Sequence, residues 1–215
     1  MSRHISVRDV EQQQPHGNND RRHTRATLLK SAAIGGGALL AGGVLIEGLP
    51  TLSAQATPSK SGDVAIWNFA LTLEYLEAAF YAEAQAKGKL TGSAADFAQV
   101  VGGHERDHVA FLEHALGSAA VAKPTFNFGS TTSDQAKFIA TAIALEDTGV
   151  AAYNGQGPNL TVAGRGPAAM IVSVEARHAA WIRDIANENP APAAFDAPKT
   201  KAQVLAAVDK THFIA

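Results

Sequence analysis

Two Glu-x-x-His segments, Glu105–His108 and Glu175–His178, constrain the fold of this chain more than any other feature. Residues three apart lie about one turn apart on an α-helix, so the carboxylate and the imidazole of each segment share one face. Apolar residues recur at helical spacing on both sides of each segment, which predicts that this face points into a core. Ionisable groups in a core must be paired or bound to a metal ion.

A two-fold repeat surrounds these segments. Glu74 corresponds to Glu146, and seven residues later Tyr81 corresponds to Tyr153. The two glutamates precede the Glu-x-x-His segments of their own halves by 31 and 29 residues, respectively. A separation of seven residues returns each tyrosine to the helix face of its glutamate. We therefore interpret the chain as two copies of one helix pair.

Hydrophobic periodicity predicts four long helices and a short fifth one, and no segment has a convincing strand pattern. The expected ranges are 61–88, 93–116, 133–155, 166–189 and 201–209. Ser93, Asp134 and Gly166-Pro167 are the expected starts of the second, third and fourth helices, because serine and aspartate cap helices and proline suits the first turn. Glycine or Asn-Pro marks the expected ends.

The connections between these helices predict their arrangement. A few residues near 88–92 join the first helix to the second, so these two are expected to be antiparallel neighbours, and about ten residues join the third to the fourth. Residues 117–132, fully extended, cover about 50 Å, which is enough to run the length of a bundle. Two antiparallel pairs joined by one long crossover form the ferritin-like topology. The expected fold is therefore an all-α, ferritin-like four-helix bundle with a short C-terminal helix.

The repeat places four glutamates and two histidines in one bundle core. Carboxylates can bridge and neutralise two divalent ions, while each imidazole binds one ion, so this set suits a pair of iron or manganese ions. Four ionised carboxylates facing one core without cations would repel each other and lose their hydration. The expected metal ligands are Glu74, Glu105, His108, Glu146, Glu175 and His178.

Other polar residues on the same faces are weaker candidates. Glu77 lies one turn from Glu74, but its counterpart in the repeat is Gly149, so symmetry favours Glu74 as the ligand. Tyr81 and Tyr153 are expected either to donate hydrogen bonds to ligand carboxylates or to pack in the core. His104 has Val174 as its counterpart and is interpreted as a surface residue or a neighbour of the ligands.

Composition excludes several other classes of protein. The chain has no cysteine, which removes disulfide frameworks, thiol catalysis and every cysteine-bound metal or iron–sulfur centre. The formal net charge of the 215 residues is −2, so no nucleic-acid partner is expected.

The N-terminal residues 1–56 have the order of an export signal. Arginines, with the pair Arg21-Arg22, precede a glycine-rich apolar run, and Ala54-Gln55-Ala56 fits a small-x-small cleavage site. A weakly apolar run of this kind is typical of twin-arginine signals, so cleavage after Ala56 and a periplasmic or extracellular location are expected. An uncleaved membrane anchor is the alternative. Residues 57–215 would form the mature domain, with no membrane span.

Four segments carry a resemblance to a known family: residues 71–81, 105–108, 149–153 and 175–178. They resemble the ferritin-like domain family, which includes exported bacterial ferritin-like proteins and desiccation-related proteins. The resemblance covers about residues 60–190. It implies a bundle with a dinuclear metal site on the six residues above, and it implies no settled reaction.

Three classes of function stay open. The first is a redox enzyme in which an iron or manganese pair reacts with O₂ or hydrogen peroxide, with ferroxidase, peroxidase and catalase-like activities all included. The second is a protein that sequesters metal ions without turnover. The third is a desiccation- or stress-related protein whose metal ions mainly stabilise the fold. A homo-oligomer is compatible with each of them.

Overall fold

The computed structural model describes residues 58–214, and the proposed export signal at 1–56 lies outside the described residues. Five α-helices make up most of this part: α2 (Lys60–Lys87), α3 (Gly92–Leu116), α4 (Gln135–Gln156), α5 (Val162–Ile185) and α6 (Lys201–Asp209). Among the described residues no strand forms, and one isolated β-bridge joins Phe126 to Ile214. The all-α prediction is confirmed.

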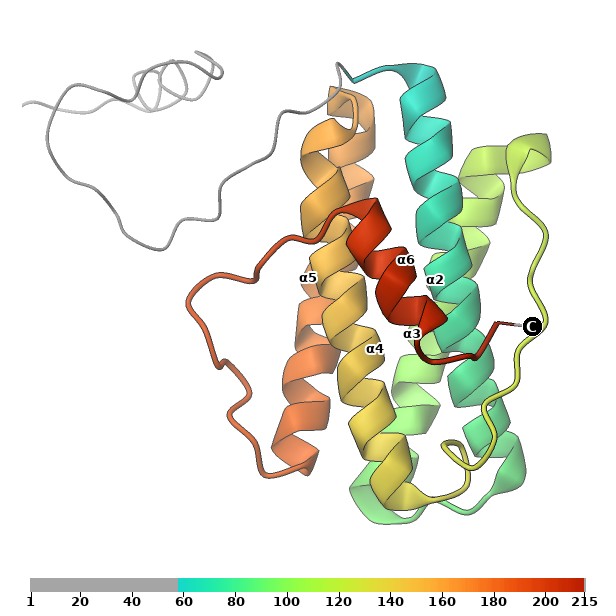
Figure 1. Cartoon of the computed structure of the whole chain (residues 1–215), viewed down its shortest axis with the longest axis vertical. Coiled ribbons are helices and arrows are strands. Elements are labelled where there is room, and N and C mark those ends of the chain that lie inside the picture. The colour runs from blue at the N-terminus through green and yellow to red at the C-terminus, as the bar shows by residue number, and fades with distance from the viewer. Residues whose placement is uncertain (1–57, 215) are drawn as a thin grey trace, which may run out of the picture. The chain divides into compact units, whose positions relative to one another are not determined.

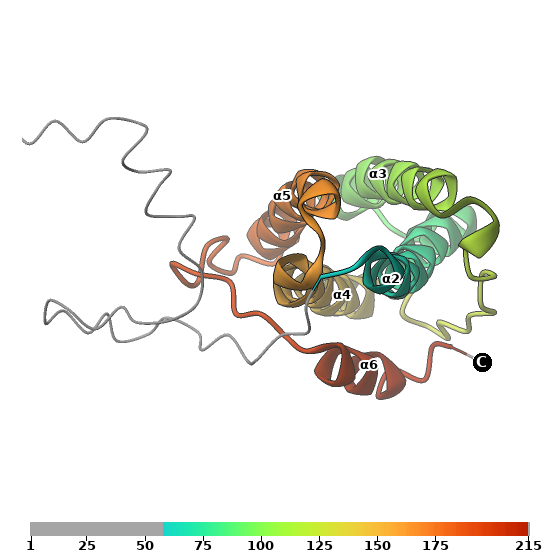
Figure 2. The same ribbon diagram turned by 90° about the horizontal axis from the view of Figure 1, so that it is seen from above.

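The four long helices form a bundle of two antiparallel pairs, α2 with α3 and α4 with α5 (Figures 1 and 2). The segment between α3 and α4 runs along the bundle before α4 begins, as the crossover prediction requires (Figure 1). The short helix α6 lies outside the bundle and packs on α4. The backbone N–H of Asn127 donates to the carbonyl of Phe213 at 2.8 Å, which ties the C-terminal end to the crossover.

Capping residues explain several helix boundaries. Ser59 caps α2, where its hydroxyl accepts from the N–H of Gly62, and Gly88 ends the helix in a left-handed conformation with φ 58°. Asp134 caps α4 as expected, since its side chain accepts from the N–H of Lys137 at 3.0 Å. The helix predicted at 201–209 is confirmed.

Two expected helix starts are wrong. The helix α3 begins at Gly92, after Thr91, so Ser93 is not its cap. The helix α5 begins at Val162, and Pro167 lies in its second turn instead of at its start. Thr161 precedes α5 and donates its backbone N–H to Asp63 of α2 at 2.8 Å. This contact with α2 places the start of α5 earlier than the local signals indicate.

Apolar side chains lie on both sides of a polar layer. Along α3, Phe97 and Val101 belong to one apolar cluster and Leu112 to another, and Glu105 lies between them. Along α5 the order is reversed, with Ile171 in the cluster of Leu112, Ile182 in the cluster of Phe97 and the second Glu-x-x-His segment between them. The layer is therefore shielded from solvent at both ends of the bundle core.

Candidate metal centre

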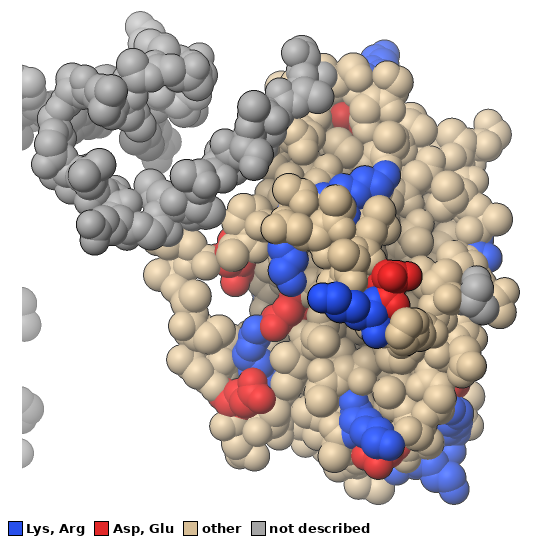
Figure 3. Space-filling view, viewed as in Figure 1, with Lys and Arg blue, Asp and Glu red and all other residues tan. Residues whose placement is uncertain are grey.

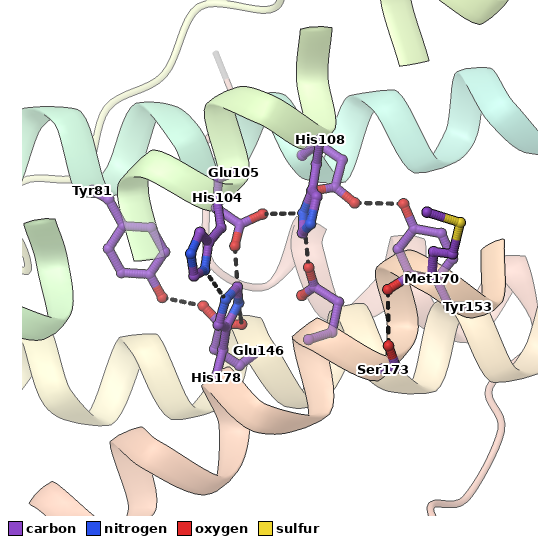
Figure 4. Close-up of polar contacts among 11 residues, drawn as sticks. Tyr81, His104, Glu105, His108, Glu146, Tyr153, Met170, Ser173 and His178 are labelled. Atoms are coloured by element: carbon purple, nitrogen blue, oxygen red, sulfur yellow. Dashed lines mark hydrogen bonds and ion pairs between the residues drawn. The ribbon is translucent and has the colours of Figure 1, made fainter. Parts of the chain in front are cut away.

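The structure brings the six predicted ligand residues together in this polar layer. One glutamate comes from α2, one from α4, and a Glu-x-x-His segment from each of α3 and α5 (Figure 4). The four glutamates are 0–1% exposed, and the side chains of His178 and His108 are 3% and 12% exposed. On the face of the molecule in Figure 3, basic and acidic side chains are interspersed on the surface. The four carboxyl groups of the layer are thus buried and separate from the charged groups of the surface.

These residues form two overlapping groups, and in each group the nearest ligand atoms lie within 4.8 Å of one another. The first group consists of Glu74, Glu105, His108 and Glu175. The second group consists of Glu105, Glu146, Glu175 and His178. Glu105 and Glu175 belong to both groups, so each can place one carboxylate oxygen toward either position. Two positions that share two carboxylates have the geometry of a dinuclear site.

Both histidines turn their Nδ1 atom toward the carboxylates. For His108, this atom lies 3.1–3.3 Å from oxygens of three carboxylates, those of Glu74, Glu105 and Glu175. For His178, it lies 3.1 Å from Glu105 and 3.3 Å from Glu146. An unprotonated Nδ1 is an imidazole ligand atom, so each histidine offers one metal bond to its own group.

The two tyrosines of the repeat contact the layer crosswise. The hydroxyl of Tyr153 donates to Oε1 of Glu74 at 2.5 Å, and the hydroxyl of Tyr81 donates to Oε1 of Glu146 (Figure 4). Each tyrosine therefore fixes the glutamate of the other half of the repeat. Both rings are buried and also pack in the apolar clusters, so hydrogen bonding and core packing occur together.

A comparison with known families decides what this bundle is. A family model described as a ferritin-like domain matches residues 62–188, which span α2 to α5 and all six residues of the layer. The chain belongs to the ferritin-like domain family. No curated protein matches it. Among the residues that the structure describes, no helix of this ferritin-like protein is long and apolar enough to cross a membrane.

Burial and mutual repulsion make the acidic layer of this ferritin-like domain costly. Burial raises the pKa of Glu105 and Glu175 well above the ordinary value, and neighbouring carboxylates raise it further. Burial alone would lower the pKa of His108, but its close contacts with three carboxylates outweigh this effect and raise the pKa to about 12. A proton on His108 thus neutralises part of the layer. A proton and a metal ion are alternatives there, because the same Nδ1 atom faces the carboxylates.

Unpartnered atoms show that the layer fits metal ions. Five buried ligand atoms have no hydrogen-bond partner, although each lies among other polar atoms: Oε1 of Glu105, Oε2 of Glu146, both oxygens of Glu175 and Nδ1 of His178. Leaving such atoms unpaired in a core costs about 1–3 kcal/mol each. The oxygens are hard ligands and the nitrogen is borderline, which suits divalent iron or manganese. The donor set of this ferritin-like domain is therefore compatible with bound metal ions.

Glu77 is a fifth buried carboxylate beside this set, 3% exposed. A Cβ atom on Gly149 would lie 3.4 Å from Oε1 of Glu77 and 3.0 Å from Oε2 of Glu175. A side chain at position 149 would therefore press on the carboxylate of Glu175, whereas its contact with Glu77 would be an ordinary one.

His104 is a direct neighbour of the layer, which is one of the two expected alternatives. Its Nδ1 atom is 2.9 Å from Nε2 of His178, and the two rings are stacked with their centroids 5.1 Å apart (Figure 4). One signal was available in the sequence: His104 and His108 are four residues apart, so both lie on one face of α3. The repeat made His104 a weaker candidate for the site, because the corresponding residue in the other half is Val174.

A surface pocket of about 440 Å³ reaches both histidines of the layer. It lies between α3 and α5, and its lining includes His104, His108 and His178 together with Asp107, Arg177 and Trp181. Trp181 is 36% exposed. Its ring packs edge-to-face on Phe97 and borders the pocket. Solvent and small solutes therefore approach the layer from its histidine side.

Proposed function

We propose that this ferritin-like protein binds two divalent metal ions, iron or manganese, and that the pair reacts with O₂ or hydrogen peroxide. One observation carries the proposal: two ligand groups share Glu105 and Glu175, and each adds a glutamate and a histidine of its own. Glu74 and His108 would hold one ion. Glu146 and His178 would hold the other.

A bound pair of such ions supplies a redox couple of up to two electrons. Peroxide disproportionation fits this couple, because it needs no outside electron donor. One peroxide molecule loses two electrons and two protons to become O₂. A second peroxide molecule gains these two electrons and two protons and becomes two water molecules. The reaction with O₂ needs an external electron source, which ferrous ions themselves supply in ferroxidase activity.

The residues of this chain have three tasks in such a reaction. Glu105 and Glu175 hold the two ions close together, and the crossed tyrosine hydroxyls fix the remaining two glutamates. The apolar clusters on either side exclude water from the ends of the layer. The pocket at the histidines admits small molecules and exchanges protons with solvent, and Asp107 and His104 line it.

Metal analysis followed by a peroxide assay tests the proposal. The full chain, loaded with Mn²⁺ or Fe²⁺, is expected to contain two ions and to release O₂ from hydrogen peroxide. Glu175→Gln should lose both properties, whereas Glu113→Gln, an exposed glutamate on the same helix as His108, should keep them. Two bound ions without peroxide or O₂ consumption would refute the redox function and leave the metal site standing.

A second function is supported by the unpartnered atoms of the layer. Metal ions that satisfy them stabilise the folded state whether or not turnover occurs. A non-catalytic role in metal sequestration, or in desiccation or stress tolerance, follows from this property alone. Bound metal and higher stability without turnover would select this function.

We further propose that residues 1–56 direct export of the protein to the periplasm or the cell exterior and are cleaved after Ala56. The order of arginines, glycine-rich apolar run and small-x-small site supports this proposal. The intact mass of the exported protein is expected to correspond to a chain that begins at Thr57. A mass that includes residues 1–56 would favour the uncleaved anchor.

A further inference from the structure

The two halves of the layer differ at two positions of the repeat. Glu77 on α2 has Gly149 as its counterpart on α4, and His104 on α3 has Val174 as its counterpart on α5. A symmetric site would need neither Glu77 nor His104. Both extra residues are in contact range of the layer, so their placement decides whether the two metal positions are equal.

The position of Glu77 along α2 points to the side of the layer that contains Glu146. Along α2 it follows Glu74 by one turn and precedes Tyr81 by one turn, and the hydroxyl of Tyr81 reaches Glu146. Among residues 58–214 it receives no hydrogen bond, although it is only 3% exposed, and its Oε1 lies beside Gly149, as does Oε2 of Glu175. Burial, followed by the charges of Glu175 and then Glu146, raises the pKa of Glu77 well above its ordinary value. A bound cation close to Glu146 would compensate this buried group.

His104 supports the histidine of the same group. When Nδ1 of His178 binds a metal ion, the ring proton must lie on Nε2, where Nδ1 of His104 accepts it at 2.9 Å. Such a partner fixes the ring orientation and the protonated nitrogen of a metal-binding histidine. Val174, the counterpart of His104, cannot accept a hydrogen bond, so His108 gains no equivalent support from that position.

The two histidines also differ in burial. The side chain of His178 is 3% exposed, and that of His108 is 12% exposed in the same pocket. A ligand with more solvent access exchanges its ion more readily, because water can replace it in steps. Burial, the extra carboxylate and the supporting histidine therefore all favour the group of Glu146 and His178.

We infer that the two metal positions are unequal. The position of Glu146 and His178, with Glu77 as an additional ligand and His104 as a positioning residue, fills first and binds more tightly. The position of Glu74 and His108 fills second and exchanges its ion through the pocket. Glu105 and Glu175 are shared, so the first ion reduces the negative charge that attracts the second. This inference rests on the proposed metal site and is independent of its reactivity.

Titration of the metal-free full chain with Mn²⁺ by calorimetry, repeated with Co²⁺ by visible absorbance, tests the order of filling. Two resolved binding events are expected for the unaltered chain. His178→Ala should remove the tighter event, and His108→Ala should remove the weaker one. Two equal events, or loss of the tighter event in His108→Ala, would overturn the inference while leaving the metal site intact. Absence of any metal binding would overturn both.

Variants of the two extra residues test their roles directly. Glu77→Gln is expected to weaken the first event by about 10-fold or more, because a lost ligand should cost at least as much as a lost neighbour of a ligand. His104→Leu is expected to weaken the first event by about 10- to 100-fold, and both variants should still bind two ions in excess metal.

Matched variants separate these roles from general effects on folding. His104→Asn places an amide oxygen where Nδ1 stands and should restore most of the affinity that His104→Leu loses. Glu113→Gln and His114→Ala, exposed residues of the same α3, should change neither event. If Glu77→Gln and His104→Leu weaken both events equally, or neither, the two residues do not act on the Glu146 position and the assignment is wrong.

Discussion

The α2–α3 pair and the α4–α5 pair follow one plan, and neither pair completes a site alone. Each supplies a glutamate, a Glu-x-x-His segment and a tyrosine, but each tyrosine donates its hydroxyl to the glutamate of the other pair. Glu105 and Glu175 each join both ligand groups. The shared plan therefore explains why two ions would bind together. Glu77 and His104 have no counterpart in the other half of the repeat, and this difference explains why the two ions would bind with unequal affinity.

The largest effect is expected from the shared carboxylates. Glu175→Ala and Glu105→Ala should each abolish loading with two ions, because each removes a ligand from both groups. Glu74→Ala should leave one ion bound, since that residue belongs to a single group. Metal-to-protein ratios after removal of excess metal give the comparison. Two equivalents at unchanged affinity in Glu175→Ala would disprove the dinuclear assignment.

Bound metal ions should also raise the free energy of unfolding of the bundle. With free metal at 100 times its dissociation constant, one ion that binds only the folded chain adds about 2.7 kcal/mol to the free energy of unfolding. Thermal unfolding of the loaded and the chelator-treated protein measures this difference. Equal melting temperatures would contradict occupation of a core site, and Glu175→Ala, with its site broken, supplies the control in which loading should have little effect.

The stability of the metal-free protein should fall as pH rises. Burial raises the pKa of Glu77, Glu105 and Glu175 above 4.5, so the folded chain holds these protons more tightly than the unfolded chain and loses that advantage as pH increases. The pKa of His108 is raised from 6.5 to about 12, so its contribution is complete below 6.5 and lost toward 12. Glu74, with its lowered pKa, acts in the opposite direction.

Unfolding of the chelator-treated protein between about pH 5 and pH 9 measures this trend. Glu77→Gln should flatten it, because one carboxyl with a raised pKa is removed. Metal affinity should increase over the same range, since the ion displaces protons from its ligands. If the metal-free protein became steadily more stable as pH rises, bound protons would not be what stabilises the polar layer in the absence of metal.

The sequence predicts the bundle and the identity of the polar layer because both depend on local spacing. Period and capping predicted the helix over 201–209, the end of α2 at Gly88 and the Asp134 cap, and the repeat brought six residues to one level of the core. The start of α5 was missed, because a contact between Thr161 and Asp63, 98 residues apart, sets it.

The fine structure of the layer depends on distances between helices, which spacing along one helix does not contain. The crossed tyrosine contacts span 65 and 79 residues of sequence, and the contact of His104 with His178 spans 74. The repeat made His104 and Glu77 weaker candidates for the site, because neither residue has a counterpart in the other half. Symmetry identifies the residues that both halves contribute to the layer, whereas the residues that break the symmetry can be placed only in three dimensions.

The smallest effect is expected from the crossed tyrosines. Tyr153→Phe removes the donor to Glu74, and Tyr81→Phe removes the donor to Glu146, while both keep a ring of similar volume in the core. Each change should lower the affinity of one ion by about 10-fold, the lower end for partners of metal ligands. Because the contacts cross, Tyr153→Phe should weaken the ion at His108, and Tyr81→Phe the ion at His178. Tyr75→Phe, whose hydroxyl donates to the exposed Glu113, is the matched control and should change neither affinity. If each tyrosine affected the ion of its own half instead, the two pairs would hold their ions separately, and the crossed coupling of the halves would be refuted.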